Sequence, residues 1–270
     1  MRVSQLAALF VVLLPLQAVA QETYTTQTPA PRTTSVPALR DLAIQREIEE
    51  RFKLGLAALG SANWTAAAAE FERIVALNPP EPRGSTAMYD LAIADANLGK
   101  NDRAAAQLQG ALARDPDFLA AMANLISVDL ARGNLDEART VADRFVAAAP
   151  QSARALYSRG VVALRSGDAT SARSDFQRLI HSNPSYAVAH YDLALAEERL
   201  EHYDSAELEL RAALALAPTY ARAQFALGAV LLKQGRRTEA RTAFAAATRD
   251  ASADPALANI AAAMRDSIAI

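Results

Sequence analysis

The sequence contains no cysteine, which excludes disulfide bonds and a thiol nucleophile. Its three histidines, His181, His190 and His202, do not fall on adjacent turns of one helix face, so no metal site is expected. A glycine-rich phosphate loop, a nucleophile elbow and a helical zinc-protease motif are also missing. The sequence therefore predicts no catalytic residue, no cofactor and no metal, and the protein is not expected to be an enzyme.

The sequence also lacks a large excess of positive or negative charge. The chain has 28 basic and 30 acidic residues, and without Arg2 the balance becomes 27 against 30, a net charge of −3. No basic stripe is available for nucleic acid. Carboxylate pairs such as Glu49-Glu50 and Glu197-Glu198 have basic residues nearby, which indicates solvated, ion-paired helix surfaces.

Long apolar runs are missing beyond the first twenty residues, so the mature chain is expected to have no membrane span. Residues 1–20 have a positive start, a short apolar run and a small-residue site, and they predict a signal peptide cut after Ala20. The alternative is an uncleaved membrane anchor. Residues 21–36, QETYTTQTPAPRTTSV, predict a disordered linker. The expected location is periplasmic or secreted, in a bacterial cell.

What the chain does have is a repeat, marked by prolines that lie 37, 34, 34 and 34 residues apart. A fixed period of this size is typical of a solenoid, in which each unit buries its apolar face against its neighbours. The prolines are Pro79, Pro116, Pro150, Pro184 and Pro218.

Small and large apolar residues recur at fixed distances before each proline. An alanine stands twelve residues before it, and mostly bulky residues stand eight before it, which places both on one helix face. A leucine followed by a small residue, 25 and 24 positions before the proline, marks an earlier helix. Only Arg159 breaks the leucine position. The pattern predicts antiparallel helix pairs, with small side chains allowing close approach.

Turn and capping residues separate the predicted helices. Glycine stands seventeen residues before the proline in four units and tolerates the left-handed conformation that ends a helix, whereas Glu201 replaces it in the fifth unit. Asn63 and Asp168 then have the chemistry of helix N-caps. The residues directly after three of the prolines are expected to cap the next unit's first helix: Asp117, Ser185 and Thr219.

This pattern resembles the tetratricopeptide repeat over residues 48–252, most clearly in Tyr191–Pro218 and Phe225–Phe244. The resemblance implies an all-α fold, a right-handed α-solenoid of about six helix-turn-helix repeats within residues 37–270. A capping helix is expected over residues 254–268, with Pro255 at its first position. The expected repeats span residues 48–81, 85–118, 119–152, 153–186, 187–220 and 221–252.

The resemblance also implies that the first helix of each hairpin lines a concave groove. Aromatic residues stand 27 positions before the prolines, in a ladder that is broken only at Ala123, and three polar residues lie near it. Aromatic side chains on a rigid surface are strong anchors for a peptide. The alternative is that they pack between neighbouring hairpins. The predicted groove residues are Phe52, Tyr89, Asn124, Arg154, Tyr157, Tyr191, Arg222 and Phe225.

Three functions follow as hypotheses. The first is a scaffold that binds a protein or peptide partner in the groove and assists a cell-envelope complex. The second is an accessory subunit of an envelope enzyme or secretion system, and the third is a self-associating structural protein, so a homo-oligomer is also considered. Some members of the family hold a partner's C-terminal carboxylates with a lysine–asparagine clamp, but Asn124 and Arg154 match only part of it. That function is therefore not transferred.

Overall fold

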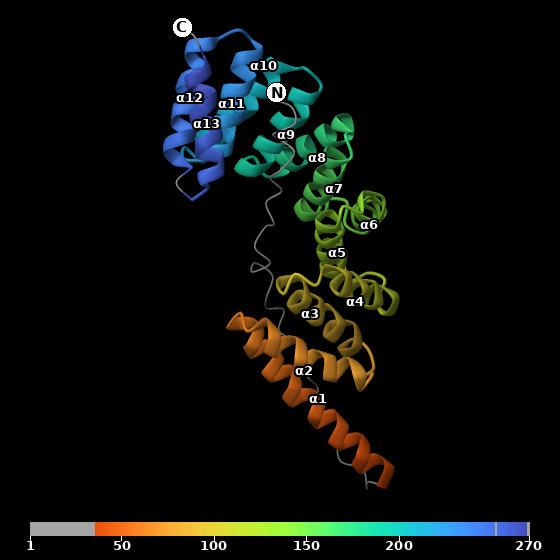
Figure 1. Cartoon of the computed structure of the whole chain (residues 1–270). Helices are drawn as coiled ribbons and strands as arrows, with labels where there is room; N and C mark the ends of the chain where they lie inside the picture. Colours follow the sequence, from red (N-terminus) through yellow and green to blue (C-terminus); the bar gives the residue numbers. More distant parts are fainter. Residues whose placement is uncertain (1–35, 252, 269–270) are drawn as a thin grey trace. The chain divides into compact units, whose positions relative to one another are not determined.

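The computed structural model describes residues 36–251 and 253–268, and in these ranges the chain is helical with no strand (Figure 1). The predicted signal peptide and most of the predicted linker lie outside the described residues. The all-α prediction is confirmed. The helices are α1 (Val36–Gly60), α2 (Trp64–Ala76), α3 (Arg83–Asn97), α4 (Asn101–Arg114), α5 (Leu119–Arg132), α6 (Leu135–Ala148), α7 (Ala153–Arg165), α8 (Ala169–Ser182), α9 (Ala187–Arg199), α10 (Tyr203–Leu216), α11 (Ala221–Lys233), α12 (Arg237–Asp250) and α13 (Pro255–Ser267).

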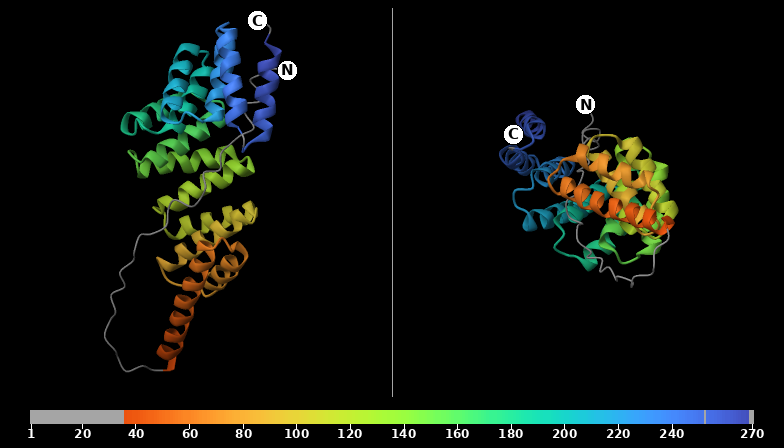
Figure 2. Two further views of the ribbon diagram at one scale, coloured as in Figure 1. Left: turned by 90° about the vertical axis from the view of Figure 1, so that its left-hand side faces the viewer. Right: turned by 90° about the horizontal axis from the view of Figure 1, so that it is seen from below.

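The described residues divide into two units, an N-terminal unit (residues 36–141) and a C-terminal unit (residues 142–268). Helix α6 begins in one unit and ends in the other. Within each unit every helix packs against the next one along the chain, from α1 to α5 and from α7 to α13 (Figure 2). The first helices of successive hairpins also touch, α7 with α9 and α9 with α11. Each hairpin therefore contributes its first helix to a shared layer.

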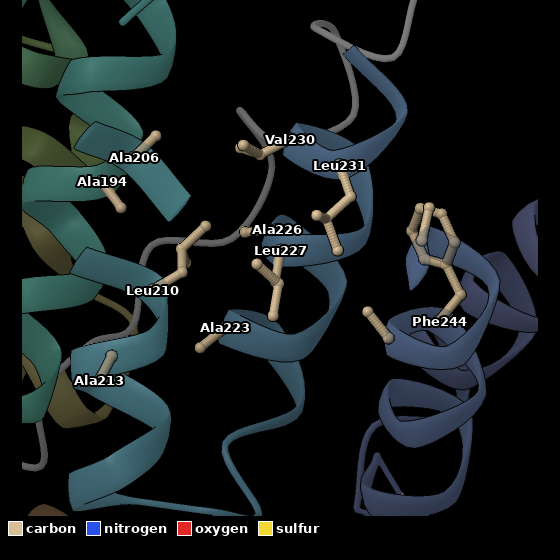
Figure 3. Close-up of a cluster of buried hydrophobic side chains, with 12 residues drawn as sticks. Ala194, Ala206, Leu210, Ala213, Ala223, Ala226, Leu227, Val230, Leu231 and Phe244 are labelled. Carbon is tan, nitrogen blue, oxygen red and sulfur yellow. The ribbon is translucent and has the colours of Figure 1, made fainter. Parts of the chain in front are cut away.

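The core is thin and alternates small with large side chains, as Figure 3 shows for the C-terminal unit. Leu210 of α10 and Phe244 of α12 are almost fully buried on either side of α11. The alanines twelve residues before the prolines, among them Ala206, have no exposed surface. Because alanine leaves room for the neighbouring helix, the bulky residues fill the remaining space at the density of a protein interior.

Each hairpin turn has one residue in the left-handed conformation at the same place in the repeat. At Gly99, Gly133, Gly167 and Gly235 the φ angles run from 74° to 84°. The two units without glycine use Ala62 and Glu201 instead, with φ of 55° and 61°. The following amide donates to a carbonyl five residues earlier in every case, for example His202 N to Glu197 O at 2.9 Å. This bond closes the helix end and holds even a non-glycine residue in this conformation.

The first helices start differently from the sequence-based expectation. Asp117, Ser185 and Thr219 do not stand at the N-cap, so that prediction is wrong. The N-cap residues are Phe118, Tyr186 and Tyr220, which make no side-chain capping hydrogen bond. The helix begins one residue later than expected, and the aromatic N-cap ring packs on the preceding hairpin. At the equivalent position before α7, Ser152 accepts a bond in the usual way, from Ala155 N at 3.3 Å.

Two of the predicted caps and the terminal helix are present as expected. The side chains of Asn63 and Asp168 accept from backbone amides three residues on, at 3.2 and 3.0 Å. Helix α13 has Pro255 at its first position and Asp254 as its N-cap, and Leu257 and Ala261 are buried against the unit. Among the described residues, none of the helices combines the length and the apolar character needed to cross a bilayer.

Candidate functional site

The ladder aromatics lie on the first helices, and all five are partly buried. Three of them pack on a phenylalanine of the second helix in their own hairpin. Their ring centroids lie 5.9 Å apart for Phe52 and Phe71, 6.0 Å for Tyr157 and Phe176, and 5.3 Å for Phe225 and Phe244. Phe52 and Phe225 therefore pack on the core of their own hairpins.

The tyrosines of the ladder make a second kind of contact, between neighbouring hairpins, as the packing alternative expects, but with partner residues that were not predicted. Each packs on the aromatic N-cap of the next first helix, 29 residues further on. In the sequence, these aromatic residues stand two positions after a proline, and the residue between the two was interpreted as a helix N-cap. The pairs are Tyr89–Phe118 at 4.9 Å, Tyr157–Tyr186 at 5.6 Å and Tyr191–Tyr220 at 5.1 Å between ring centroids.

Two of these pairs surround one carboxyl group in the C-terminal unit. We call Tyr157, Tyr186, Tyr191, Tyr220 and Asp192 the tyrosine–aspartate cluster. The Tyr157 hydroxyl lies close enough to donate a hydrogen bond to the Asp192 carboxyl group. Burial, and after it the charge of Asp192, raises the pKa of Tyr157, Tyr186 and Tyr220. All four hydroxyls therefore lie within electrostatic range of the carboxyl group, since Asp192 also raises the pKa of Tyr191.

Asp192 keeps its proton to a higher pH than a surface carboxylate does. Burial raises its pKa to about 7, although the hydrogen bond from Tyr157 acts in the opposite direction. Its Oδ2 atom is buried and has no hydrogen-bond partner among the described residues. Such an atom carries a desolvation cost that nothing within the unit offsets.

A simpler form of the same arrangement occurs in the N-terminal unit. Asp90 follows Tyr89 as Asp192 follows Tyr191, 102 residues or three 34-residue repeats earlier. Asp90 is buried at 7% exposure, and this burial raises its pKa to about 7. A buried acid beside an aromatic pair is therefore a feature of two separate repeats.

The predicted polar residues of the groove differ in their surroundings. Asn124 on α5 is buried, with 4% of its surface exposed. Arg154 on α7 is exposed. Arg222 on α11 pairs with the N-cap carboxylate Asp254 at 3.8 Å, and its charge reaches Tyr191 and Tyr220. Arg222 is thus placed beside the tyrosine–aspartate cluster.

Two of the three histidines make hydrogen bonds that join neighbouring segments of the fold. His190 Nδ1 lies 2.6 Å from a Glu209 carboxylate oxygen, and its Nε2 lies 3.0 Å from the Pro184 carbonyl oxygen. His202 in the α9–α10 turn bonds to Glu197 at 2.8 Å. In the part of the chain that the structure describes, no three acidic or histidine side chains are grouped so that they could hold a metal ion.

Solved structures of repeat proteins resemble the chain. A tetratricopeptide repeat protein from Parabacteroides merdae ATCC 43184 has a TM-score of 0.66 at 15% identity, over 83% of this chain and 94% of its own. TTC0263, a thermophilic repeat protein of Thermus thermophilus, has a TM-score of 0.56 at 25% identity, over 67% and 98%. YrrB, described as a repeat protein with an unusual peptide-binding site, has a TM-score of 0.57 at 19% identity, over 73% and 100%.

The family model gives the same result from the sequence. No curated protein matches the chain. The model of the tetratricopeptide repeat, in contrast, matches it four times, at residues 52–118, 89–152, 123–187 and 191–255. These matches cover well over half of the 270 residues and coincide with the observed hairpins. The chain therefore belongs to the tetratricopeptide repeat family.

Proposed function

We propose that this protein is a non-catalytic scaffold that binds an extended peptide or a helix of a partner protein on its layer of first helices. The observation that carries the proposal is the tyrosine–aspartate cluster. It places four aromatic rings and one buried carboxyl group on α7, α9 and α11 or at their starts. Large, rigid aromatic side chains give much contact area at a low cost in conformational entropy.

The family supports the same function. Tetratricopeptide repeats present stacked first helices as binding surfaces, and the structural neighbour YrrB is described as having a peptide-binding site. Peptide recognition on such a surface is driven by a few anchor side chains rather than by total area. We therefore expect Tyr157 and Tyr191 to account for most of the affinity for a partner.

The test is crosslinking in intact cells followed by recovery of the tagged protein, in the wild type and in two variants. Tyr157→Ala and Tyr191→Ala should each reduce recovery of the partner at least about tenfold, the effect of losing one anchor. Recovery of the same partner at wild-type level from both variants would rule out the first-helix surface.

A matched control lies on a second helix. Leu208 on α10 is the most exposed of the large apolar side chains that the structure describes, at 67%. Leu208→Ala removes a similar exposed apolar group without touching the first helices. It should leave partner recovery unchanged. An equal loss of partner recovery in all three variants would indicate that the partner binds to a different surface or associates non-specifically.

We also propose that the protein acts in the bacterial cell envelope, after removal of residues 1–20. The support is the leader-like composition of these residues and the cut site after Ala20. A direct test is the N-terminal sequence of the protein recovered from a periplasmic fraction. Gln21 is the expected first residue, whereas recovery of the uncut chain in the membrane fraction would favour the anchor.

A second candidate is self-association, which one observation favours. Leu42, Leu54 and Leu56 of α1 are exposed at 46%, 55% and 52%. The equivalent of Leu54 in the next hairpin, Leu91, is buried at 1%, because there a preceding hairpin covers it. Light scattering tests this candidate: an oligomer that Leu54→Glu converts to a monomer would support it, and a monomeric wild type would refute it.

A further inference from the structure

We infer that the tyrosine–aspartate cluster is a site for one positively charged side chain, the ammonium of a lysine or the guanidinium of an arginine, carried by the bound peptide. This inference deepens the proposed function and rests on it. It assigns to one repeat boundary of the C-terminal unit the chemical class of side chain that the scaffold selects.

The first observation is the unpartnered acid. Asp192 Oδ2 is buried, and none of the described residues hydrogen-bonds to it. Native proteins rarely leave a buried carboxyl oxygen without a partner, because the cost is larger than for a neutral polar group. A donor brought by a ligand removes that cost, and a cationic donor also compensates the charge.

The second observation concerns the cations of the unit itself. Arg222, the basic residue beside the cluster, pairs with the Asp254 carboxylate at 3.8 Å. The positive charges of Lys233 and Arg199 interact with a different acid, Glu198. They lower its pKa, whereas burial raises it. The described groups that set the ionisation of Asp192 include no lysine or arginine. The acid therefore has no counter-ion within the described chain.

The third observation is the surrounding aromatic surface. The hydroxyls of the two ring pairs, Tyr157–Tyr186 and Tyr191–Tyr220, lie within electrostatic range of Asp192. Within each pair the rings are tilted, and their planes meet at 47° and 53°. Tyrosine faces attract ammonium and guanidinium groups, and the attraction grows when the cation is desolvated. One carboxylate beside four tyrosine rings therefore fits a cation better than an anion or a neutral amide.

The repeat provides an internal comparison. Asp90, with Tyr89 and Phe118, reproduces one acid and one aromatic pair in the N-terminal unit. It lacks the second aromatic pair, because Glu81 stands two residues after Pro79, where the C-terminal unit has Tyr186 two residues after Pro184. We therefore assign the cation site to the C-terminal unit, where the aromatic surface is complete.

The site can be tested without knowing the partner, by using side-chain analogues as probes. The purified protein is labelled with ¹³C in its seven tyrosines, and n-butylammonium or n-propylguanidinium chloride is added at pH 8 and constant ionic strength. The rings of Tyr157, Tyr186, Tyr191 and Tyr220 should shift and saturate, while Tyr203 on α10 should not. The neutral analogue n-propylurea should bind at least about tenfold more weakly.

Two variants make the result specific. Asp192→Asn keeps the shape of the side chain and should weaken the binding of both cations at least about tenfold. Asp266→Asn removes the same charge from an exposed position on α13 and should leave the affinity for both cations unchanged. Tyr220→Leu gives a second test that leaves Asp192 in place, and it should also weaken binding. Ring shifts that are equal for n-propylurea, or unchanged by Asp192→Asn, would overturn the inference.

Peptide libraries separate this inference from the proposed function. Randomised decapeptides with one position fixed as Lys, Arg, Gln or Glu are passed over the immobilised protein. Retention that favours Lys or Arg and is lost in Asp192→Asn supports both the cation site and the peptide scaffold. Retention without a preference for either cation leaves peptide binding in place and overturns the cation site. Analogue binding at the cluster with no peptide retained supports the site and counts against the peptide scaffold.

Discussion

A Cβ atom added to Gly160 on α7 would lie 2.7 Å from Cε1 of Phe176 on α8. The same contact occurs between Gly55 and Phe71 and between Gly228 and Phe244, at 2.7 and 2.8 Å. Where the repeat has alanine instead of glycine, the facing residue is a leucine, as in Ala194 with Leu210. The two positions therefore vary together, so that each hairpin fills the same space.

This relationship predicts the effect of one methyl group. Gly160→Ala should destabilise the protein by about 1–3 kcal/mol, because the new Cβ overlaps a phenylalanine ring that is fully buried. Urea unfolding followed by circular dichroism measures the change. The double variant Gly160→Ala with Phe176→Leu copies the Ala194–Leu210 pair and should be more stable than Gly160→Ala alone. A double variant less stable than the single one would contradict the matching of sizes.

The hairpins could be predicted from the sequence because their signals are local and repeated. Alanine, glycine and proline at fixed spacing determine the helix pairs, and any one unit could be checked against five others. The conformation of Glu201 could not be predicted in this way, because the residue type disfavours positive φ. The bond from His202 N to Glu197 O, within the same hairpin, holds it in this conformation.

A second prediction concerns this strained position. Glu201→Gly should stabilise the protein by about 0.5–1 kcal/mol, since relief of the left-handed strain exceeds the extra entropy of glycine in the unfolded chain. Gly167→Ala, the reverse change in the preceding hairpin, should destabilise it by about 1 kcal/mol. Thermal and urea unfolding of both variants measure the two effects. Changes of the same sign in both would refute the explanation.

A third prediction concerns Arg159, which stands where other repeats have leucine. It donates to both carboxylate oxygens of Asp175, at 2.8 and 2.7 Å, and Asp175 is almost fully buried. Arg159→Leu should cost about 3 kcal/mol, because it leaves that carboxylate buried without its main partner. The fall in the urea midpoint measures this cost.

The double variant Arg159→Leu with Asp175→Ala is the control for that cost. It copies the pair Leu227 and Ala243 found two repeats later. An apolar pair in place of an ion pair is often neutral, so most of the lost stability should return. No recovery in the double variant would show that Arg159 stabilises the hairpin through other contacts, such as the one to Asp143 at 3.5 Å.

The candidate site was only partly predictable, for a physical reason. The ladder positions follow from the period of the repeat, and Tyr157 and Tyr191 do share a cluster. Their partners Tyr186 and Tyr220 were not identified, because the aromatic residue two positions after the proline recurs in the sequence without showing which residue of the preceding hairpin it contacts. The burial of Asp192 is likewise a tertiary effect, since an aspartate on a helix is usually solvated.

The last prediction is a pH dependence of stability. Burial holds the pKa of Asp192 at about 7 in the folded chain, against its usual value near 3.8 when unfolded. Between pH 4 and pH 7 the folded state keeps a proton that the unfolded state has lost, so the free energy of unfolding should fall as the pH rises. Above pH 7 both states are ionised and this dependence ends. Asp192→Asn should flatten the fall in urea midpoints between pH 4.5 and 7.5, whereas Asp266→Asn should retain it. A wild-type slope that Asp192→Asn leaves unchanged would mean that Asp192 is ionised throughout this range.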